Sequence, residues 1–209
     1  MLRLIIIVVI VFGILLDSTI SAQQRDTLLR FEADPTQGYN FPYYIYIPAG
    51  CNPLFEVTML VEPNNTGMPN DTFQVHEKAA EIQARFGPLG NSISRTLHLP
   101  LLVPVFPRDQ KHWKIYTHML DRDVMRIKKG PLKRLDLQLL EMINAAREVL
   151  FRLGYRTTQK ILMCGYSSSG VFANRFACLH PETIKAYSAG GIKGLLMMPF
   201  SRMENEKLK

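Results

Sequence analysis

Hydrophobic positions along the chain follow two different spacings. Short, continuous apolar or β-branched runs predict strands at residues 43–47, 55–61, 160–164 and 183–189. Apolar residues at intervals of three or four predict amphipathic helices at residues 71–86, 131–153 and 169–179. Strands that alternate with helices of this length predict an α/β fold, with a mostly parallel sheet and helices on both faces.

Two details of this pattern are specific enough to check. The first helix should begin at an Asp71–Gln74 cap and bury one apolar stripe, formed by Val75, Ala79, Ile82 and Phe86. A further apolar run covers residues 97–106, and its two prolines predict an edge strand or a bend. Residues 107–130 show no periodicity and predict an irregular loop.

The N-terminus predicts a secretory signal peptide. Arg3 precedes an apolar run from Leu4 to Leu16, and small residues follow as far as Ala22. The run is shorter than the roughly 20 residues that span a bilayer as a helix. We therefore expect residues 1–22 to be a signal peptide, residues 23–209 to be one domain, and the protein to be secreted or periplasmic. The alternative is an uncleaved anchor, which would be the only contact with a membrane.

The amino-acid composition further narrows the class of protein. With 47% hydrophobic and 21% charged residues, the chain is globular rather than disordered or fibrous, and its three cysteines are too few for a disulfide scaffold. No cysteine or histidine cluster has zinc spacing and no glycine-rich phosphate loop occurs, so we expect no metal and no cofactor. A basic cluster contributes to the net charge of +7. It predicts a solvated surface, steering of an anionic substrate, or binding to a cell-envelope surface, and it consists of Arg126, Lys128, Lys129, Lys133 and Arg134. No motif for nucleic-acid binding accompanies it.

The most specific local signal is a serine-rich turn, Gly165-Tyr-Ser-Ser-Ser-Gly170, between a buried strand and a helix. A nucleophile at such a turn is held on strained backbone with its oxygen above the strand ends. This geometry requires small residues two positions before and after the nucleophile. Gly165 and Ser169 satisfy that requirement around Ser167, whereas Tyr166 fails it around Ser168. Ser167 is therefore the candidate nucleophile.

Residues 40–195 resemble the α/β-hydrolase superfamily, and most of all its secreted esterases and polyester depolymerases. The resemblance rests on the strand at 160–164, the turn, the helix at 171–179, and the strand that ends at Gly190-Gly191. It implies hydrolysis of a small or polymeric carboxylic ester through an acyl-enzyme on Ser167. It also implies an oxyanion hole made by the N–H of Ser168 and the N–H of Asn64 or Asn65.

The proton acceptor for Ser167 is harder to place. His180 is the only histidine after Ser167, and it lies at the far end of the predicted helix, roughly 20 Å away. His118 with Asp121 is a conceivable alternative, and His76 is expected on the surface. The superfamily supplies its acid and histidine after the serine, so the domain is expected to be incomplete at its C-terminus, with an exposed sheet edge and poor solubility. The alternative function is a non-catalytic fragment or a secreted binding protein.

Overall fold

The computed structural model describes residues 25–192. The predicted signal peptide and the C-terminal residues 193–209 lie outside the described residues. Within residues 25–192, none of the helices combines the length and the apolar character needed to cross a bilayer.

A single six-stranded sheet organises the described chain, with the strand order β1-β2-β4-β3-β5-β6. The strands are β1 (Thr27–Phe31), β2 (Tyr43–Ile47), β3 (Leu60–Val61), β4 (Leu101–Pro104), β5 (Ile161–Tyr166) and β6 (Ile184–Gly190). β4, β3, β5 and β6 are parallel to one another, whereas β1 and β2 form an antiparallel edge. The predicted mostly parallel sheet is confirmed.

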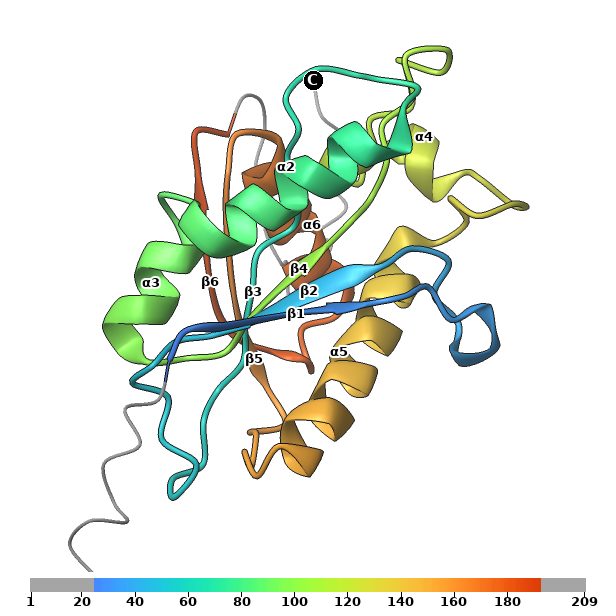
Figure 1. The fold of residues 1–209 in the computed structure, drawn as a ribbon. Coiled ribbons are helices and arrows are strands. Elements are labelled where there is room, and N and C mark those ends of the chain that lie inside the picture. The colour runs from blue at the N-terminus through green and yellow to red at the C-terminus, as the bar shows by residue number, and fades with distance from the viewer. Residues whose placement is uncertain (1–24, 193–209) are drawn as a thin grey trace, which may run out of the picture.

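Helices cover both faces of the sheet, as predicted (Figure 1). One face is covered by α2 (Phe73–Phe86) and α3 (Gly90–Leu97), and the other by α5 (Leu135–Arg152) and α6 (Ser168–Leu179). The loop after β4 contains the short helix α4 (Arg122–Met125) and the 3₁₀ turn η2 (Thr117–Met119), and a second such turn, η1 (Pro35–Gln37), follows β1.

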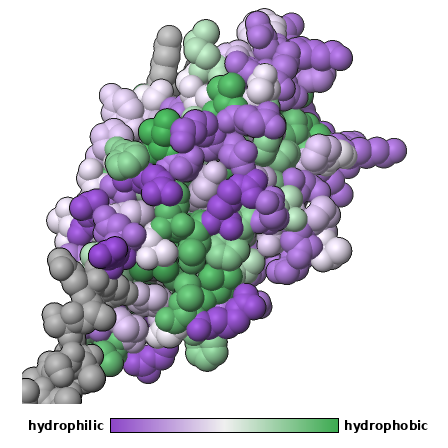
Figure 2. All heavy atoms as spheres, viewed as in Figure 1, coloured by the Kyte–Doolittle hydropathy of each residue, from purple (hydrophilic) through white to green (hydrophobic). Residues whose placement is uncertain are grey.

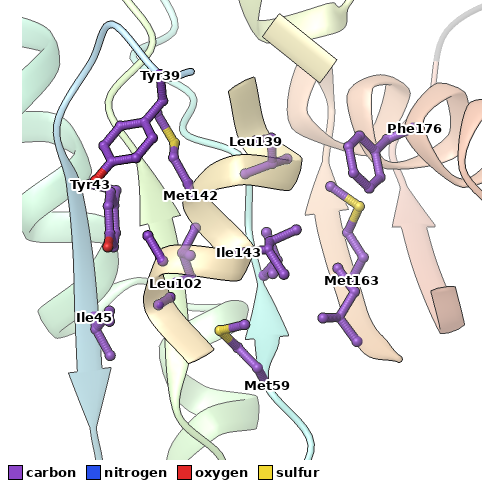
Figure 3. Packing of buried hydrophobic residues seen from close by; sticks show 14 of the residues in the cluster. Tyr39, Tyr43, Ile45, Met59, Leu102, Leu139, Met142, Ile143, Met163 and Phe176 are labelled. Carbon is purple, nitrogen blue, oxygen red and sulfur yellow. The ribbon is translucent and has the colours of Figure 1, made fainter. Parts of the chain in front are cut away.

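The larger hydrophobic core lies between the sheet and the helices α5 and α6. In Figure 3 the α5 residues Leu139, Met142 and Ile143 lie over the sheet, near Met163 of β5 and Met59, which directly precedes β3. All five side chains are at most 2% exposed. This core packs against β5, and the serine turn directly follows the carboxyl end of that strand.

The predicted buried stripe of α2 is wrong. Val75, Ile82 and Phe86 are 40%, 49% and 74% exposed, while His76, Ala80 and Ala84 are fully buried. Small residues on the inner face let the helix axis approach the sheet closely, and the larger apolar side chains then point outward. The predicted cap also fails, because Asp71 instead accepts backbone hydrogen bonds from residues 110 and 111.

Several boundaries differ from the predictions for local reasons. β4 is a central strand, because its prolines lie at or outside its ends, where they leave the ladder intact. Leu97 belongs to α3, a helix that the sequence pattern did not predict, and β1 was not predicted either. β3 keeps only Leu60 and Val61 of the predicted run from residue 55, and Phe55 is 67% exposed.

Candidate functional site

Ser167 occupies a sharp corner between β5 and α6. Its backbone angles are φ 57° and ψ −121°, a combination that side-chain-bearing residues rarely adopt. The other described non-glycine residues with positive φ have ψ between 43° and 60°, which is ordinary left-handed helical backbone: His98, Leu120 and Arg134. Ser167 itself is exposed. The predicted turn is therefore formed, with strained backbone at the predicted residue.

Close backbone contacts explain which residues the corner accepts. A Cβ atom on Gly165 would lie 2.3 Å from the carbonyl oxygen of Ser169, and one on Gly170 would lie 2.7 Å from the carbonyl oxygen of Gly190. Ser169 Oγ accepts a hydrogen bond from the Tyr166 N–H and donates one to the Tyr166 carbonyl, each at 3.0 Å. Ser169 therefore stabilises the corner through two hydrogen bonds, and its small side chain also fits there.

The N–H of Ser168 is one potential oxyanion donor. Ser168 is the first residue of α6, so its N–H has no acceptor within the helix and lies at the positive end of the helix dipole. The donor is thus supplied by the same corner that strains Ser167.

The loop after β3 carries the two residues, Asn64 and Asn65, from which the second donor was predicted. The Asn65 N–H donates to Gln83 Oε1 at 3.2 Å, whereas the Asn64 N–H has no hydrogen-bond acceptor among the described residues. Of the two predicted loop residues, Asn64 therefore keeps its backbone donor available.

Side chains hold this loop from both sides. Asn64 Oδ1 accepts from the Phe106 N–H and its Nδ2 donates to the Phe106 carbonyl, each at 3.0 Å. On the opposite side, Gln83 Nε2 of α2 donates to the Pro63 carbonyl at 3.1 Å. These bonds link the loop to the end of β4 and to α2, so its backbone donors have fixed positions.

Glu62 lies buried beneath the loop. It is 6% exposed, and its Oε2 accepts a hydrogen bond from the Gly90 N–H at 3.0 Å. Burial raises the pKa of Glu62 to about 7, against the opposing effects of hydrogen bonds from Gln83 and Gly90. The loop therefore rests on a carboxyl group that titrates near neutral pH.

An open hollow of about 650 Å³ lies beside the corner and is mostly apolar. Its lining includes Ala79, Ile82, Phe86, Leu89, Tyr166 and Ser169. The outward-facing apolar side chains of α2, Ile82 and Phe86, thus line a hollow next to the corner at Ser167. Two aromatic residues of the segment after β4 do not line this hollow: Phe106 is in the core and Trp113 is 59% exposed.

His180 belongs to a separate buried cluster at the other end of α6. Its Nε2 lies 3.0 Å from Asp136 Oδ2, and Asp136 also accepts two hydrogen bonds from Arg134. Burial would raise the pKa of Asp136, but its bonds to Arg134 and His180 outweigh burial and lower it. Twelve helical residues, about 18 Å, separate this cluster from Ser167. The prediction that His180 does not reach Ser167 is consistent with these contacts.

His118 is also engaged away from the corner. It is 1% exposed, and its Nε2 donates to the Phe106 carbonyl at 2.8 Å. Burial lowers the pKa of His118 to about 4, so the imidazole is neutral at physiological pH. Asp121 caps α4 by accepting from the Val124 N–H. The conceivable arrangement of Ser167, His118 and Asp121 is therefore not formed.

The three other histidines do not contact Ser167 either. His76 is fully buried rather than on the surface, with its ring nitrogens 2.8 Å from Thr66 Oγ1 and from the Asn70 carbonyl. His98 and His112 are exposed. Within residues 25–192 no histidine is hydrogen-bonded to Ser167, and no cluster of three His, Cys, Asp or Glu residues is arranged to hold a metal ion.

Sequence reasoning missed Glu62, Gln83 and the buried Arg108. Glu62 directly follows the apolar run of β3, and a charged residue at the end of a buried strand was a usable signal. Gln83 carried no signal, because its role depends on how α2 faces the loop.

No protein-family model and no curated protein matches the sequence. Among solved structures, the chain is similar to poly(aspartic acid) hydrolase-1 from Sphingomonas sp. KT-1, with a TM-score of 0.51 and 14% identity over 88% of this chain and 62% of that one. It is also similar to an S-formylglutathione hydrolase from Agrobacterium tumefaciens, with a TM-score of 0.50 and 13% identity over 80% of this chain and 58% of that one. A ferulic acid esterase gives a TM-score of 0.50 at 11% identity, over 80% of this chain and 61% of that one. The chain therefore spans less than two thirds of each of these structures, and at such identities the likeness establishes a shared fold.

Proposed function

Because the chain has the α/β-hydrolase fold and bends sharply at Ser167, we propose that it is a serine hydrolase of carboxylic esters with Ser167 as its nucleophile. The observation that carries the proposal is the backbone of Ser167, with φ 57° and ψ −121° on an exposed residue between a strand and a helix. Strain of this kind persists where the surrounding structure enforces it, and it concentrates at functional sites. The proposal includes export of the protein through residues 1–22.

The reaction follows from the groups at the corner. Ser167 Oγ forms a bond to the ester carbonyl carbon, and its proton passes to a base. The N–H groups of Ser168 and Asn64 donate to the developing oxyanion. Collapse breaks the bond to the alkoxide, which takes up the proton and leaves as an alcohol, and water then hydrolyses the acyl-enzyme to the carboxylic acid.

The proposal assigns the acyl group of the ester to the hollow beside the corner. Ile82 and Phe86 supply exposed apolar surface there, and Tyr166 and Ser169 belong to the corner itself. An open hollow of about 650 Å³ accommodates a small ester or the end of a polymer chain.

The proton acceptor is the part of the reaction that the described residues leave open. All five histidines of the sequence fall within residues 25–192, and each makes its contacts away from Ser167. The proposal therefore gives the base to a group other than these five histidines, and the chain alone should hydrolyse esters slowly. A small soluble base should then replace the missing one.

Chemical rescue tests this directly. Hydrolysis of a short-chain nitrophenyl ester is measured with increasing imidazole, and the rate with imidazole alone is subtracted from the rates with wild type and with the Ser167→Ala variant. The proposal predicts a protein-dependent rate that rises with imidazole and disappears in the variant. Equal rates for the two folded proteins at every imidazole concentration would remove the catalytic function.

The contacts of the histidines favour one second candidate, a binding protein with the same fold and no catalysis. This candidate predicts that ligands enter the hollow while Ser167 stays unreactive at every imidazole concentration. Binding of a nitrophenyl ester by folded protein without any rescue would support it.

A further inference from the structure

A surface of apolar and basic side chains lies at the edge of the sheet opposite Ser167. Residues 54–56, between β2 and β3, and residues 151–160, at the end of α5 and after it, form this surface, which we call the basal face. The two segments are adjacent, because the Val57 N–H donates to the Arg156 carbonyl at 2.9 Å and Arg156 Nη2 donates to the Leu54 carbonyl at 3.4 Å. Both lie at the lower end of the molecule in Figure 1.

The basal face exposes four large apolar side chains. Leu54 and Phe55 are 76% and 67% exposed, and Phe151 and Leu153 are 71% and 49% exposed. Exposed apolar residues that are scattered singly are ordinary, whereas a group of them indicates a contact surface. Four such side chains on two adjacent segments therefore indicate that the basal face meets an apolar phase or partner.

The cations of the basal face have no partner charge in the part of the chain that the structure describes. Arg152, Arg156 and Lys160 are exposed, and none of the ion pairs within residues 25–192 includes any of them. Arg152 and Arg156 line an open hollow of about 480 Å³ together with Phe151 and Arg147. Charged and apolar groups therefore share one surface.

The nearby acids do not balance these cations. Glu56 lies on the basal face and Glu148 lines its hollow, and both are exposed. Lys185 adds a further positive charge at the margin, where its Nζ lies 3.5 Å from Thr58 Oγ1. The basal face is therefore positive overall, and it attracts a negatively charged partner.

The chain enters the described structure at the same edge of the sheet. β1 starts beside the end of β2, and Asp26 Oδ1 accepts a hydrogen bond from the Ala49 N–H at 2.9 Å. β5 runs from the basal face to the corner at Ser167, and its six residues span about 20 Å. A membrane that the predicted N-terminal segment enters would therefore adjoin the basal face and not Ser167.

We propose that the basal face docks on an anionic lipid bilayer, with its apolar side chains at the boundary of headgroups and acyl chains and its cations beside the lipid phosphates. Apolar side chains flanked by basic ones suit this boundary, because the first bury apolar area and the second lie in the negative surface potential. The exposed apolar side chains favour a bilayer over a purely polar polyanion. This contact is additional to any contact made by the predicted N-terminal segment, and it leaves Ser167 open to the aqueous side.

Cosedimentation of the full 209-residue chain with vesicles tests the inference. Vesicles of phosphatidylcholine are compared with vesicles of equal parts phosphatidylcholine and phosphatidylglycerol. We expect binding to the anionic vesicles to be roughly tenfold tighter or more, and to weaken as salt is added. Arg152→Gln with Arg156→Gln should remove roughly tenfold of this affinity, and Leu54→Ser with Phe151→Ser should remove a similar factor through lost apolar burial.

Matched controls remove the same groups elsewhere. Lys128→Gln with Lys129→Gln neutralises two exposed cations that precede α5, whose 18 residues, about 27 Å, separate them from the basal face. Met68→Ser removes an apolar side chain that is 77% exposed in the loop after β3. Both variants should bind anionic vesicles as tightly as wild type. Circular dichroism and thermal melting show that every variant is folded.

A tryptophan on the basal face locates the contact, because the apolar N-terminal run is common to all these proteins. Trp113 is the one tryptophan of the sequence and lies in the loop after β4. Phe151→Trp combined with Trp113→Phe should give fluorescence that brominated lipids in anionic vesicles quench. The fluorescence of Trp113 in wild type should not be quenched.

Three results would overturn the inference. The first is equal affinity of the basal-face and control variants for anionic vesicles, and the second is unquenched fluorescence from tryptophan at position 151. The third is an absence of vesicle binding while Leu54→Ser with Phe151→Ser abolishes self-association, since the basal face would then contact a second copy of the chain. Rescue of ester hydrolysis by imidazole is independent of all three, so the proposed function stands or fails separately.

Discussion

At the residue scale, burial and hydrogen bonding together set the protonation of the enclosed acids and histidines. Glu62 and His118 are both nearly inaccessible, and burial favours the neutral form of each, so the pKa of the first rises and that of the second falls. Asp136 is equally buried, yet its bonds to Arg134 and His180 keep it charged. The loop that carries Asn64 therefore lies beside two buried groups, Glu62 and His118, whose neutral forms burial favours.

Glu62 gives a prediction about stability and pH. The folded state keeps the proton of Glu62 up to about pH 7, while the unfolded chain loses it near pH 4.5. The free energy of unfolding should therefore fall as pH rises through this window, by up to about 3 kcal/mol for this group. Urea unfolding of wild type and Glu62→Gln between pH 4 and 8 measures the difference, because other titrating groups contribute equally to both. Parallel curves for the two proteins would contradict the assignment.

At the element scale, the corner is a joint between β5, α6 and β6. Gly165 contacts the first turn of α6, and Gly170 contacts the end of β6, both through backbone atoms. Neither contact can yield without moving a strand or a helix. The strain on Ser167 is thus imposed by the packing of three elements.

Gly165→Ala tests this joint. The added methyl group should move the start of α6, cost about 1–3 kcal/mol of stability, and abolish labelling of Ser167 by a fluorophosphonate in imidazole. Gly154→Ala is the control, since its φ of +91° strains alanine but no atom lies within 4 Å of the new Cβ. That variant should lose stability and keep labelling. Labelling that persists in folded Gly165→Ala would show that the corner tolerates a different geometry.

Gln83 tests the loop that faces the corner. Gln83→Leu removes the bonds to the Pro63 carbonyl and the Asn65 N–H, which should let the loop shift and slow labelling roughly 10- to 100-fold, less than or similar to the loss of a whole oxyanion donor. Gln74→Leu changes an exposed residue of the same helix and should leave the rate unchanged. A rate in Gln83→Leu equal to wild type would mean that the loop does not contribute a donor.

The sequence predicted the elements that depend on local pattern. The helices α5 and α6 and the strand β5 are periodic or fully apolar, and the corner at Ser167 follows from the sizes of its neighbours. The sequence did not show which face of α2 is buried, because the buried face carries Ala80 and Ala84 and is less apolar than the face that points outward. The hydrogen bonds that hold the loop after β3 come from Phe106 and Gln83 on distant elements, which no local spacing encodes.

At the scale of the whole molecule, the two edges of the sheet differ. The edge at β1 is antiparallel, whereas β6 ends the parallel part and its residues 185–188 are exposed. Apolar patches also lie among the hydrophilic side chains on the face shown in Figure 2. An open strand edge together with apolar surface favours association between molecules, which is the basis of the predicted poor solubility.

A charge on the open edge should reduce that association. Ala186→Lys places an amine on an exposed position of β6, and Ala49→Lys places the same charge on an exposed loop between β2 and β3. Light scattering over a range of concentrations should show association of wild type and Ala49→Lys, and less of it for Ala186→Lys. Equal scattering by the three proteins would exclude β6 as the contact.

The central claim is that Ser167 is the nucleophile, and the site of covalent labelling tests it most directly. The full chain is incubated with a fluorophosphonate in imidazole and digested, and the modified residue is identified by mass spectrometry. The account predicts an adduct on Ser167, whose rate of formation rises with imidazole, and none on the adjacent Ser168 and Ser169. An adduct on either neighbour, or no adduct on folded protein at any imidazole concentration, would contradict it.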